Sequence, residues 1–427
     1  MRAASRLATI AVVFAGSVAA FGQPLPIAAP ETVGLSSERL AYVSKTFSAE
    51  VELGRLPGVV IAIARKGQLA YFEAIGFQDK PAGVRMTKDA IFRAFSMTKP
   101  WTSVAAMRLV EEGRMQLTDP VSKYLPSMKG LQVSVAARDA TTGQTTYSMV
   151  AGDREPTIQD LLRHTSGIAY DNVTRNAPVK QALETGGLKN AGLDSRDKLT
   201  AQEFVAALSK APLSSQPGTT WEYSLSTSLL GRVVEAVSGM PLARYLDEQL
   251  FRPLKMTDSS FSVPQEKAGR IAQPLNRAGW FDPTTVPLND LGGEGGISTA
   301  SDYLRFSQML LNGGQLDGKR ILSRNTVALM ASDHLAGRPS SPAGPGEVLM
   351  GVPGYTFGLG FMVRTGAGIA GVPGSVGEYM WGGAGGTFFW VDPKEELVAV
   401  FMSQGPFPLR ASYRRLVKQL VYAAIAD

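Results

Sequence analysis

The sequence predicts an α/β (α+β) protein, in which a β-sheet domain built from both ends of the chain carries a mostly helical insertion. Two strand candidates lie near the N-terminus, at 58–65 and 69–76. Three more lie near the C-terminus, at 357–363, 387–391 and 397–402. Between them, apolar residues recur mainly at the three- to four-residue spacing of helices. Strands at both ends with helices between them favour one sheet that the two ends complete together.

The N-terminal elements follow from capping and turn signals. Ser36-Ser37-Glu38 opens a helical pattern that runs to Leu53. Residues 58–65 are apolar and rich in β-branched side chains, and Lys66-Gly67 is a turn signal. With 69–76 as the second strand, this segment predicts a β-hairpin. A second helix is expected over 96–112, because its apolar residues are three to four positions apart.

The middle of the chain is mostly helical in pattern, with long loops. The polar, glycine-containing segments 129–155 and 171–200 are expected to be irregular, and loops of this length are usually functional or mobile. The expected helices are Thr157–His164, with Thr157 as N-cap, then 201–208, 226–237 and 242–250, and finally 411–425. The predicted division is a sheet domain over 31–100 and 288–427 and a helical domain over 101–287.

The first residues have the order of a secretory signal peptide. Arg2 and Arg6 precede an apolar run from Leu7 to Phe21, in which Val18-Ala19-Ala20 offers a cleavage motif. The run is shorter than the about 20 residues that a membrane span needs. We therefore expect residues 1–22 to be a signal peptide and the protein to be periplasmic or secreted, without stable membrane insertion. If the leader is not cleaved, the protein would be cytoplasmic.

The composition excludes several classes of protein. Hydrophobic residues make up 44% and charged residues 19%, which are ordinary values for a globular chain. The net charge of +6 is spread over 427 residues, so no nucleic-acid partner is expected. The chain has no cysteine and two histidines, which excludes disulfides, a thiol nucleophile and thiolate zinc sites. We expect no metal or cofactor, and a monomer.

A Ser-x-x-Lys tetrad, Ser96-Met97-Thr98-Lys99, opens the expected helix 96–112. Positions i and i+3 of a helix lie on one face about 5–6 Å apart, so Lys99 can approach the Ser96 hydroxyl. The free N–H groups at a helix start favour developing negative charge. A lysine buried there loses proton affinity and can act as a base. The second copy, Ser195-Arg196-Asp197-Lys198, lies in a charged segment with no apolar face, so the context favours Ser96.

Two further segments carry chemistry. Tyr223, in Pro217-Gly218-Thr219-Thr220-Trp221-Glu222-Tyr223-Ser224, precedes a helix pattern, and its phenol can relay a proton if a cation lies nearby. Trp381-Gly382-Gly383-Ala384-Gly385-Gly386-Thr387 leads into an apolar strand. Its glycines let a substrate approach the backbone, where an N–H can serve as an oxyanion donor. The structural alternatives are a half-buried tyrosine and a glycine-rich turn between strands.

In their order and separation, the three segments resemble the motifs of the serine β-lactamase, DD-peptidase and family VIII carboxylesterase superfamily. The resemblance covers nearly all of the mature chain. It implies an antiparallel sheet with flanking helices, a mostly helical second domain and a cleft between them. Its further matching segments are Leu161–Gly167, Gly113–Val121 with Tyr124-Leu125-Pro126, and Gly292–Asp302.

The resemblance also assigns roles. Ser96 matches the nucleophile, Lys99 its base partner and Tyr223 the tyrosine of the second motif. Trp381-Gly382-Gly383 matches the third motif, on the strand that borders the active site and contacts substrate. The backbone N–H groups of Ser96 and Ala384 would form the oxyanion hole.

Two departures from the pattern predict the substrate. Penicillin-recognising members usually carry Tyr-x-Asn in the second motif, where this chain has Leu225. They start the third motif with Lys or His, which suits a substrate carboxylate, where this chain has the uncharged Trp381. Leucine and tryptophan in these places suit an uncharged, partly apolar acyl ester, as in family VIII carboxylesterases. The alternatives are a class C-like β-lactamase or DD-peptidase acting on amides, a related acyltransferase, and a penicillin-binding homologue that acylates without turnover.

Other candidates carry less weight. The chain has no Gly-x-Ser-x-Gly motif, and neither His164 nor His334 is expected to be a catalytic base. Glu294, among four glycines, is expected in a solvated turn rather than in the cleft. Asn172-Val173-Thr174 fits a glycosylation acceptor, but so short a motif is weak evidence.

Overall fold

The computed structural model describes residues 25–337, 341, 343–405 and 407–427. The predicted signal peptide, residues 1–22, lies outside these residues. Within the described part of the chain, no helix has the length and apolar character that crossing a membrane requires.

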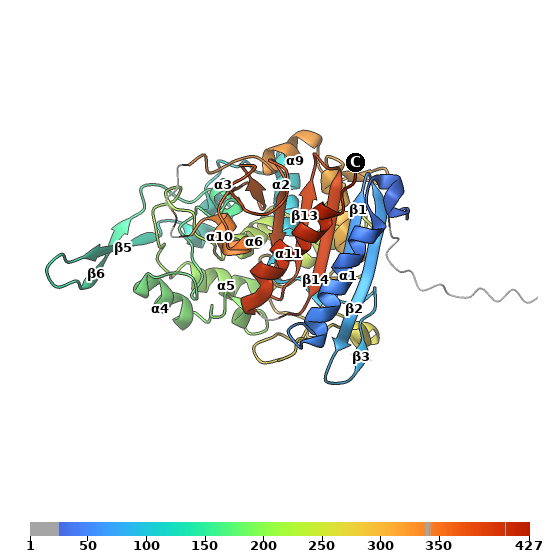
Figure 1. The fold of residues 1–427 in the computed structure, drawn as a ribbon. Coiled ribbons are helices and arrows are strands. Elements are labelled where there is room, and N and C mark those ends of the chain that lie inside the picture. The colour runs from blue at the N-terminus through green and yellow to red at the C-terminus, as the bar shows by residue number, and fades with distance from the viewer. Residues whose placement is uncertain (1–24, 338–340, 342, 406) are drawn as a thin grey trace, which may run out of the picture.

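Both ends of the chain contribute to one eight-stranded antiparallel sheet, in the order β10-β11-β12-β13-β14-β1-β2-β3 (Figure 1). β1 joins the two ends, because it pairs with β14 from Val59 opposite Ser403 to Arg65 opposite Leu397. This sheet confirms the predicted fold class. Its strands are β1 (Gly58–Arg65), β2 (Gln68–Asp79), β3 (Val84–Arg85), β10 (Tyr355–Phe357), β11 (Met362–Arg364), β12 (Tyr379–Gly382), β13 (Phe388–Asp392) and β14 (Leu397–Ser403).

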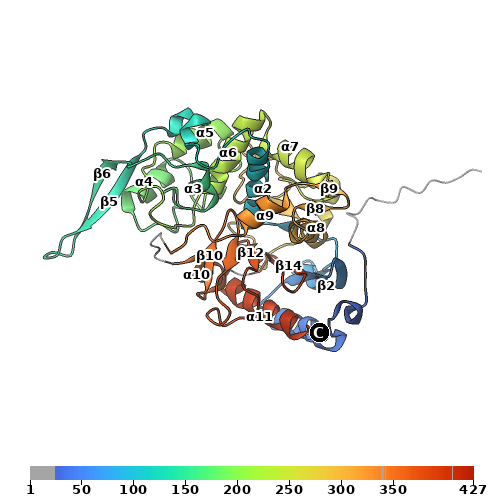
Figure 2. The ribbon, with the colours of Figure 1, turned by 90° about the horizontal axis from the view of Figure 1, so that it is seen from above.

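Helices cover both faces of the sheet (Figure 2). α1 (Ser37–Glu52) and α11 (Arg410–Ala423) lie side by side on one face. α8 (Ala300–Leu311) packs against β14, β1 and β13 on the other. α1 begins where the sequence predicts, because the Ser36 side chain accepts a hydrogen bond from the Arg39 backbone N–H.

The helical part of the chain centres on α6 (Ser226–Ser238). α6 packs against α2 (Thr98–Glu111), α3 (Ile158–Leu162) and α5 (Ala201–Leu208), and the predicted helices at these positions are present. Thr157 caps α3 in a capping box with Asp160, as its position before the helix predicts. The described residues also form α4 (Ala177–Thr185), α7 (Leu242–Leu246), α9 (Arg324–Met330) and α10 (Pro345–Met350), and the two-residue strands β4 (Phe92–Arg93) and β7 (Ile297–Ser298).

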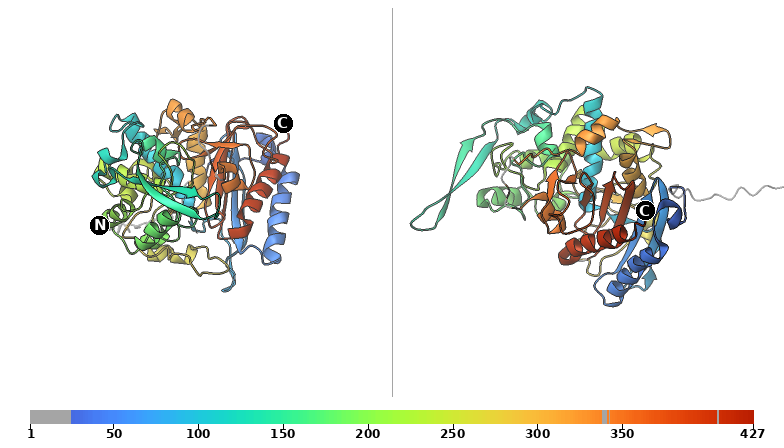
Figure 3. Two further views of the ribbon diagram at one scale, coloured as in Figure 1. Left: turned by 90° about the vertical axis from the view of Figure 1, so that its left-hand side faces the viewer. Right: turned by 45° about the horizontal axis from the view of Figure 1, so that its top comes forward.

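The segment 129–155 is not an irregular loop, and that prediction was wrong. It contains the hairpin β5 (Gln132–Arg138) and β6 (Thr145–Ala151), which projects from the helical part (Figure 3). Most of its side chains are exposed, so the hairpin lacks the apolar alternation that marks a half-buried strand. The Asp139 carboxylate, which accepts hydrogen bonds from the backbone N–H groups of Thr141 and Thr142, forms its turn.

Two other segments differ from prediction. The loop expected over 171–200 contains α4, whose N-cap Asn176 and early Pro178 are standard helix-start residues. The single strand expected over 357–363 is the turn of a hairpin, because β10 ends at Phe357 and β11 begins at Met362. Gly360, with φ +95°, lies in that turn.

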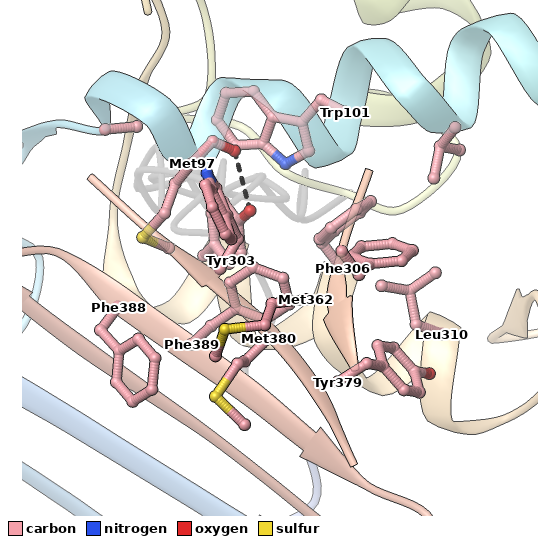
Figure 4. Close-up of a cluster of buried hydrophobic side chains, with 14 of the residues drawn as sticks. Met97, Trp101, Tyr303, Phe306, Leu310, Met362, Tyr379, Met380, Phe388 and Phe389 are labelled. Carbon is pink, nitrogen blue, oxygen red and sulfur yellow. Dashed lines mark hydrogen bonds between the residues drawn. The ribbon is translucent and has the colours of Figure 1, made fainter. Parts of the chain in front are cut away.

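An aromatic core supports the start of α2 (Figure 4). Trp101 of α2 lies 5.3 Å from the ring of Tyr303, and Tyr303 lies 4.9 Å from the ring of Phe389 on β13. The Tyr303 hydroxyl donates a hydrogen bond to the Met97 carbonyl at 2.8 Å. Because close-packed aromatic side chains are costly to displace, this core fixes the first turn of α2 against the sheet.

Candidate active site

A sharp turn presents Ser96 at the start of α2. Phe95 has a φ of +48°, which is uncommon for a residue other than glycine, and Phe95–Met97 form a 3₁₀ turn. The Thr98 hydroxyl donates to the Phe95 carbonyl at 2.6 Å and accepts from the Gly296 N–H at 2.9 Å. α2 therefore begins at Thr98, and Ser96 lies in the turn before it, where it lines a cleft. Strained backbone of this kind clusters at functional sites.

Lys99 is almost fully buried beneath Ser96, with 1% of its side chain exposed. Its Nζ lies 3.5 Å from the Ser96 Oγ and 3.1 Å from Oε1 of Glu294. It also donates to the Tyr170 hydroxyl and the Gly293 carbonyl, both at 2.8 Å. Burial alone would lower the pKa of Lys99, but the Glu294 carboxylate, followed by Tyr223, raises the pKa above its usual value. Burial thus acts on the pKa of Lys99 in the predicted direction, but Glu294 outweighs it and favours the ammonium form over the neutral base that was expected.

Glu294 belongs to the site, and its prediction as a solvated residue was wrong. The residue is 3% exposed, and its Oε2 accepts a hydrogen bond from the Ser228 hydroxyl at 2.6 Å. The glycines around it, which suggested a surface turn, instead allow close packing against α2. A Cβ on Gly293 would lie 2.6 Å from the Ser228 Oγ and 3.1 Å from the Lys99 Nζ.

Tyr170 is a site residue that the sequence analysis missed. Its hydroxyl accepts a hydrogen bond from Lys99 and donates one to Glu294. Burial, with the nearby Glu294 carboxylate, raises the pKa of Tyr170 well above its usual value, which favours the neutral phenol. The residue follows the matching segment Leu161–Gly167 by three positions, and a lone tyrosine there gives no periodic or motif signal.

Tyr223 lies beside Lys99 and Trp381. The Lys99 Nζ is 4.7 Å from the centroid of the Tyr223 ring. The Trp381 Nε1 donates a hydrogen bond to the Tyr223 hydroxyl at 3.3 Å, and the two rings are 5.1 Å apart. The structure thus brings together Ser96, Lys99 and Tyr223, which are distant in sequence.

The third motif lies at the end of β12, next to the turn that carries Ser96. Trp381, Gly382, Gly383 and Ala384 all line the cleft, although Trp381 is only 1% exposed. A Cβ on Gly383 would lie 2.2 Å from the Ala94 carbonyl oxygen, so this close approach requires glycine. The Gly383 N–H donates to the Thr387 carbonyl, whereas the Ala384 N–H has no partner among the described residues. A backbone N–H without a protein acceptor at this place can donate a hydrogen bond to a ligand oxygen.

Leu225 is not in the cleft, contrary to its prediction as a substrate contact. Its side chain is fully buried just before α6 and packs close to Gly192, whose added Cβ would lie 2.6 Å from it. A side chain with no exposed surface cannot touch a substrate directly. The loop over 190–193 lies between Leu225 and the cleft, and Asn190, Ala191 and Leu193 line the cleft in its place.

The remaining candidates, two histidines and a second serine, do not belong to the candidate active site. His164 hydrogen-bonds through Nδ1 to the Ser224 hydroxyl at 3.0 Å, and burial lowers its pKa well below the usual value. His334 bonds to Gln159 and to the Leu329 carbonyl. Ser195, the serine of the second tetrad, is buried and donates to the Gly192 carbonyl at 2.7 Å. Neither histidine is among the described residues that line the cleft.

The cleft has a volume of about 510 Å³ and lies between the sheet and the helical part. Apolar residues predominate in its walls, and three of them are large side chains left exposed at its surface: Val173, Leu275 and Phe407. Asn172, the first residue of the glycosylation motif, also lines it. A concave, mostly apolar site with a few convergent polar groups is the usual form of a small-molecule site.

The comparisons with known proteins agree with this geometry. The family model described as Beta-lactamase matches residues 43–422. An uncharacterized protein of Mycobacterium tuberculosis is 34% identical over 369 residues, covering 83% of this chain and 87% of that protein. Esterase EstB of Burkholderia gladioli is 30% identical over 393 residues, covering 85% of this chain and 90% of the esterase.

A solved structure shares the fold over most of its length. EstCE1, described as a hydrolase with promiscuous acyltransferase activity, superposes with a TM-score of 0.72 at 25% identity, covering 90% of this chain and 98% of EstCE1. With the family match and the esterase relative, this similarity defines the chain as a serine hydrolase. The chain therefore belongs to the β-lactamase family, in the superfamily of serine β-lactamases, DD-peptidases and family VIII carboxylesterases.

Proposed function

We propose that the protein is a carboxylesterase that hydrolyses short- to medium-chain acyl esters through an acyl-enzyme on Ser96. One observation carries the proposal: Ser96 and Tyr223 line the same mostly apolar cleft, and the Nζ of the buried Lys99 lies 3.5 Å from the Ser96 Oγ and 4.7 Å from the centroid of the Tyr223 ring. The nucleophile, the proton carrier and the oxyanion donors would all come from the chain. We further propose that it acts as a monomer in the periplasm or outside the cell.

The positive charge on Lys99 favours Tyr223 as the group that accepts the Ser96 hydroxyl proton. An ammonium held by Glu294 has no lone pair to accept the Ser96 proton, so we infer that the Tyr223 oxygen accepts it. The Lys99 ammonium and the Trp381 indole N–H both favour negative charge on the Tyr223 oxygen. Tyr223 then returns the proton to the leaving alcohol as the ester bond breaks.

Oxyanion stabilisation would come from the backbone. As Ser96 attacks the carbonyl carbon, negative charge develops on the carbonyl oxygen. Hydrogen bonds from the backbone N–H groups of Ser96 and Ala384 would stabilise this charge. Water then attacks the acyl-enzyme while Tyr223 takes its proton, and Tyr223 gives this proton to the Ser96 oxygen as the acyl bond breaks and the carboxylic acid leaves.

Acyl transfer is a second candidate, because an alcohol can replace water in the last step. The cleft of about 510 Å³ has room for both an acyl group and an acceptor. EstCE1, with its promiscuous acyltransferase activity, is a structural neighbour over nearly its full length. Product analysis with an added alcohol distinguishes the two outcomes, since transfer yields a new ester.

A covalent label tests the proposed function. A fluorophosphonate should add once to the protein, as measured by intact mass, and Ser96→Ala should abolish both the adduct and hydrolysis of nitrophenyl butyrate. Ser195→Ala is the matched control, because it alters the serine of the other Ser-x-x-Lys tetrad. An adduct that persists in Ser96→Ala, or turnover of a cephalosporin faster than of the ester, would contradict the proposal.

A further inference from the structure

Arg410 is a cation in the cleft wall that has no acidic partner. It is the first residue of α11, it is half-buried, and it lines the cleft. Its guanidinium carbon lies 3.5 Å from the centroid of the Phe407 ring. Among the residues that the structure describes, none accepts a hydrogen bond from it or forms an ion pair with it. Its hydrogen-bond donors are therefore free to bind a ligand.

The partial burial of the Arg410 charge is unfavourable unless a ligand of opposite charge binds beside it. Burial lowers the pKa of Arg410, and no carboxylate among the described residues offsets this effect. A partly desolvated cation without a counter-ion costs free energy, and an anion in the cleft would remove that cost. Stacking on Phe407 holds the guanidinium plane in place, so little freedom is lost when an anion binds.

Arg414, one helical turn after Arg410, differs from it because its guanidinium hydrogen-bonds to the protein. It is buried and donates to the Leu349 carbonyl at 2.8 Å and to the Gly383 carbonyl at 2.7 Å. Arg414 therefore serves the structure, by holding the third motif against α11. Residues four apart lie on one face of a helix, so Arg410 extends from this anchor along the same wall of the cleft.

The hydrogen bond from Arg414 to the Gly383 carbonyl also indicates on which side of a bound ester Arg410 lies. Gly383 directly follows Trp381-Gly382, and the Trp381 indole contacts the Tyr223 hydroxyl. Arg410 and Arg414 line the same cleft as Tyr223 and Trp381. In the proposed reaction, Tyr223 gives its proton to the leaving oxygen, so this side of the cleft holds the alcohol portion of the substrate.

Acidic residues do not balance this charge. Glu294 is the one carboxylate among the described residues that line the cleft. Its two oxygens already accept hydrogen bonds from Lys99, Tyr170 and Ser228. The wall around Arg410 is therefore positive, and it favours a negatively charged group.

We propose that Arg410 binds a carboxylate on the alcohol portion of the ester substrate. This inference rests on the proposed function and specifies its substrate class: an uncharged acyl group joined to an alcohol that carries a carboxylate. It revises the sequence-based expectation of a wholly uncharged ester, which considered only Trp381. The positive charge missing from the third motif is supplied instead from α11.

A pair of substrates that differ in one charge tests the proposal. 4-Acetoxybenzoate carries its carboxylate on the leaving phenol, and methyl 4-acetoxybenzoate is its neutral counterpart. The kcat/KM ratio of the two is measured for the wild type, Arg410→Ala, Arg410→Lys and Arg85→Ala. Arg85 is the matched control, because its guanidinium also stacks on a phenylalanine, Phe77, but lies on β3, away from the cleft.

Arg410→Ala should lower kcat/KM for 4-acetoxybenzoate by about tenfold to a hundredfold, the usual value of a charge-assisted hydrogen bond, and change the methyl ester by less than about threefold. Arg410→Lys should restore part of the loss, and Arg85→Ala should leave the ratio unchanged. An equal loss on both esters, or no loss on either, would overturn the proposal. So would a loss confined to nitrophenyl hemisuccinate, whose carboxylate is on the acyl portion.

Binding of 4-hydroxybenzoate, measured by titration calorimetry, separates this inference from the proposed function. If the wild type hydrolyses neither ester, the proposed function fails. Binding that weakens at least about tenfold in Arg410→Ala still supports the anion site, and binding that does not change overturns it.

Discussion

The Lys99 ammonium lies 3.1 Å from the Glu294 carboxylate, and only 1% and 4% of the two side chains is exposed. The pair joins the first turn of α2 to the glycine-rich turn before β7, two segments far apart in sequence. The Glu294 carboxylate also raises the pKa of Lys99 and so favours its ammonium form, whereas burial alone would favour the neutral amine. Lys99 therefore provides a fixed positive charge beneath Ser96 and Tyr223.

Glu294→Gln should lower the free energy of unfolding by about 3–5 kcal/mol, because it leaves the buried Lys99 charge without its partner. Urea denaturation monitored by fluorescence measures this change. Glu222→Gln is the matched control: Glu222 is half-buried and accepts a hydrogen bond from the Ser214 hydroxyl at 2.6 Å, but no cation contributes to its pKa. A similar loss of stability in both variants would contradict the role assigned to the Lys99–Glu294 pair.

Lys99 and Tyr223 should act as one proton-transfer unit. Lys99→Gln and Tyr223→Phe should each lower kcat by about 10²–10⁴, the usual size of general acid–base catalysis. The double variant should be little worse than the poorer single variant, because residues that act together are not additive. Ester turnover under saturating substrate measures all three, and fully multiplicative losses would be inconsistent with a single unit.

Tyr170→Phe is the matched test of which tyrosine carries the proton. It removes a phenol that also contacts Lys99, but Glu294 and the Gly293 carbonyl still hold the ammonium. We expect kcat to fall by less than about tenfold, against the much larger loss in Tyr223→Phe. If the two variants lose the same activity, Tyr223 is not the specific proton carrier.

Asp160 should make stability fall in acid. Burial alone would raise the pKa of its carboxyl, but hydrogen bonds, first from Arg154 and then from the Thr157 N–H, lower it to about 2. The ionised form is thus favoured in the folded state, and its contribution is present above pH about 4 and lost as pH falls toward 2. From the difference between these values, the contribution is about 2 kcal/mol.

Denaturation of the wild type and Asp160→Asn at several pH values measures this contribution. The difference in unfolding free energy between the two should shrink by about 2 kcal/mol between pH 5 and pH 2. Asp153→Asn is the control, because Asp153 is exposed nearby. A difference that stays constant with pH would mean that the Asp160 carboxylate is not selectively stabilised by folding.

Local signals in the sequence were sufficient for the elements that depend on local chemistry. The caps Ser36 and Thr157 predict the starts of α1 and α3, and Lys66-Gly67 predicts the turn of the β1–β2 hairpin. Strand candidates at both ends predict a shared sheet, and the β1–β14 pairing is present. These predictions succeed because capping and turn geometry involve residues that are close in sequence.

Residues positioned by packing between distant segments could not be predicted in this way. Tyr170 and Glu294 are 124 positions apart, and both contact Lys99 as well as each other. Glycines around Glu294 allow a close approach as readily as a surface turn, so composition does not distinguish the two. Leu225 follows the motif tyrosine by two positions, but the loop over 190–193 separates it from the cleft.

Trp381 should favour esters over β-lactams whose carboxylate lies against the third motif, because Trp381 supplies no charge there and Arg410 lies on α11 instead. Its ring packs 5.1 Å from Tyr223 and 5.3 Å from Phe357, so it forms the wall next to the proposed proton carrier. A β-lactam brings a carboxylate, and a lysine in this wall can pair with it. A charge-assisted hydrogen bond contributes about 1.5–3 kcal/mol, which is about tenfold to a hundredfold in kcat/KM.

Trp381→Lys should therefore raise the ratio of kcat/KM for a cephalosporin to kcat/KM for nitrophenyl butyrate. Loss of the indole can harm both reactions, because Trp381 also donates to the Tyr223 hydroxyl, so the ratio is the quantity to measure. Trp381→Phe is the matched control: it removes the indole N–H without adding charge, and it should leave the ratio within about threefold of the wild type. If Trp381→Lys and Trp381→Phe change the ratio equally, the preference comes from the shape of the wall and not from its charge.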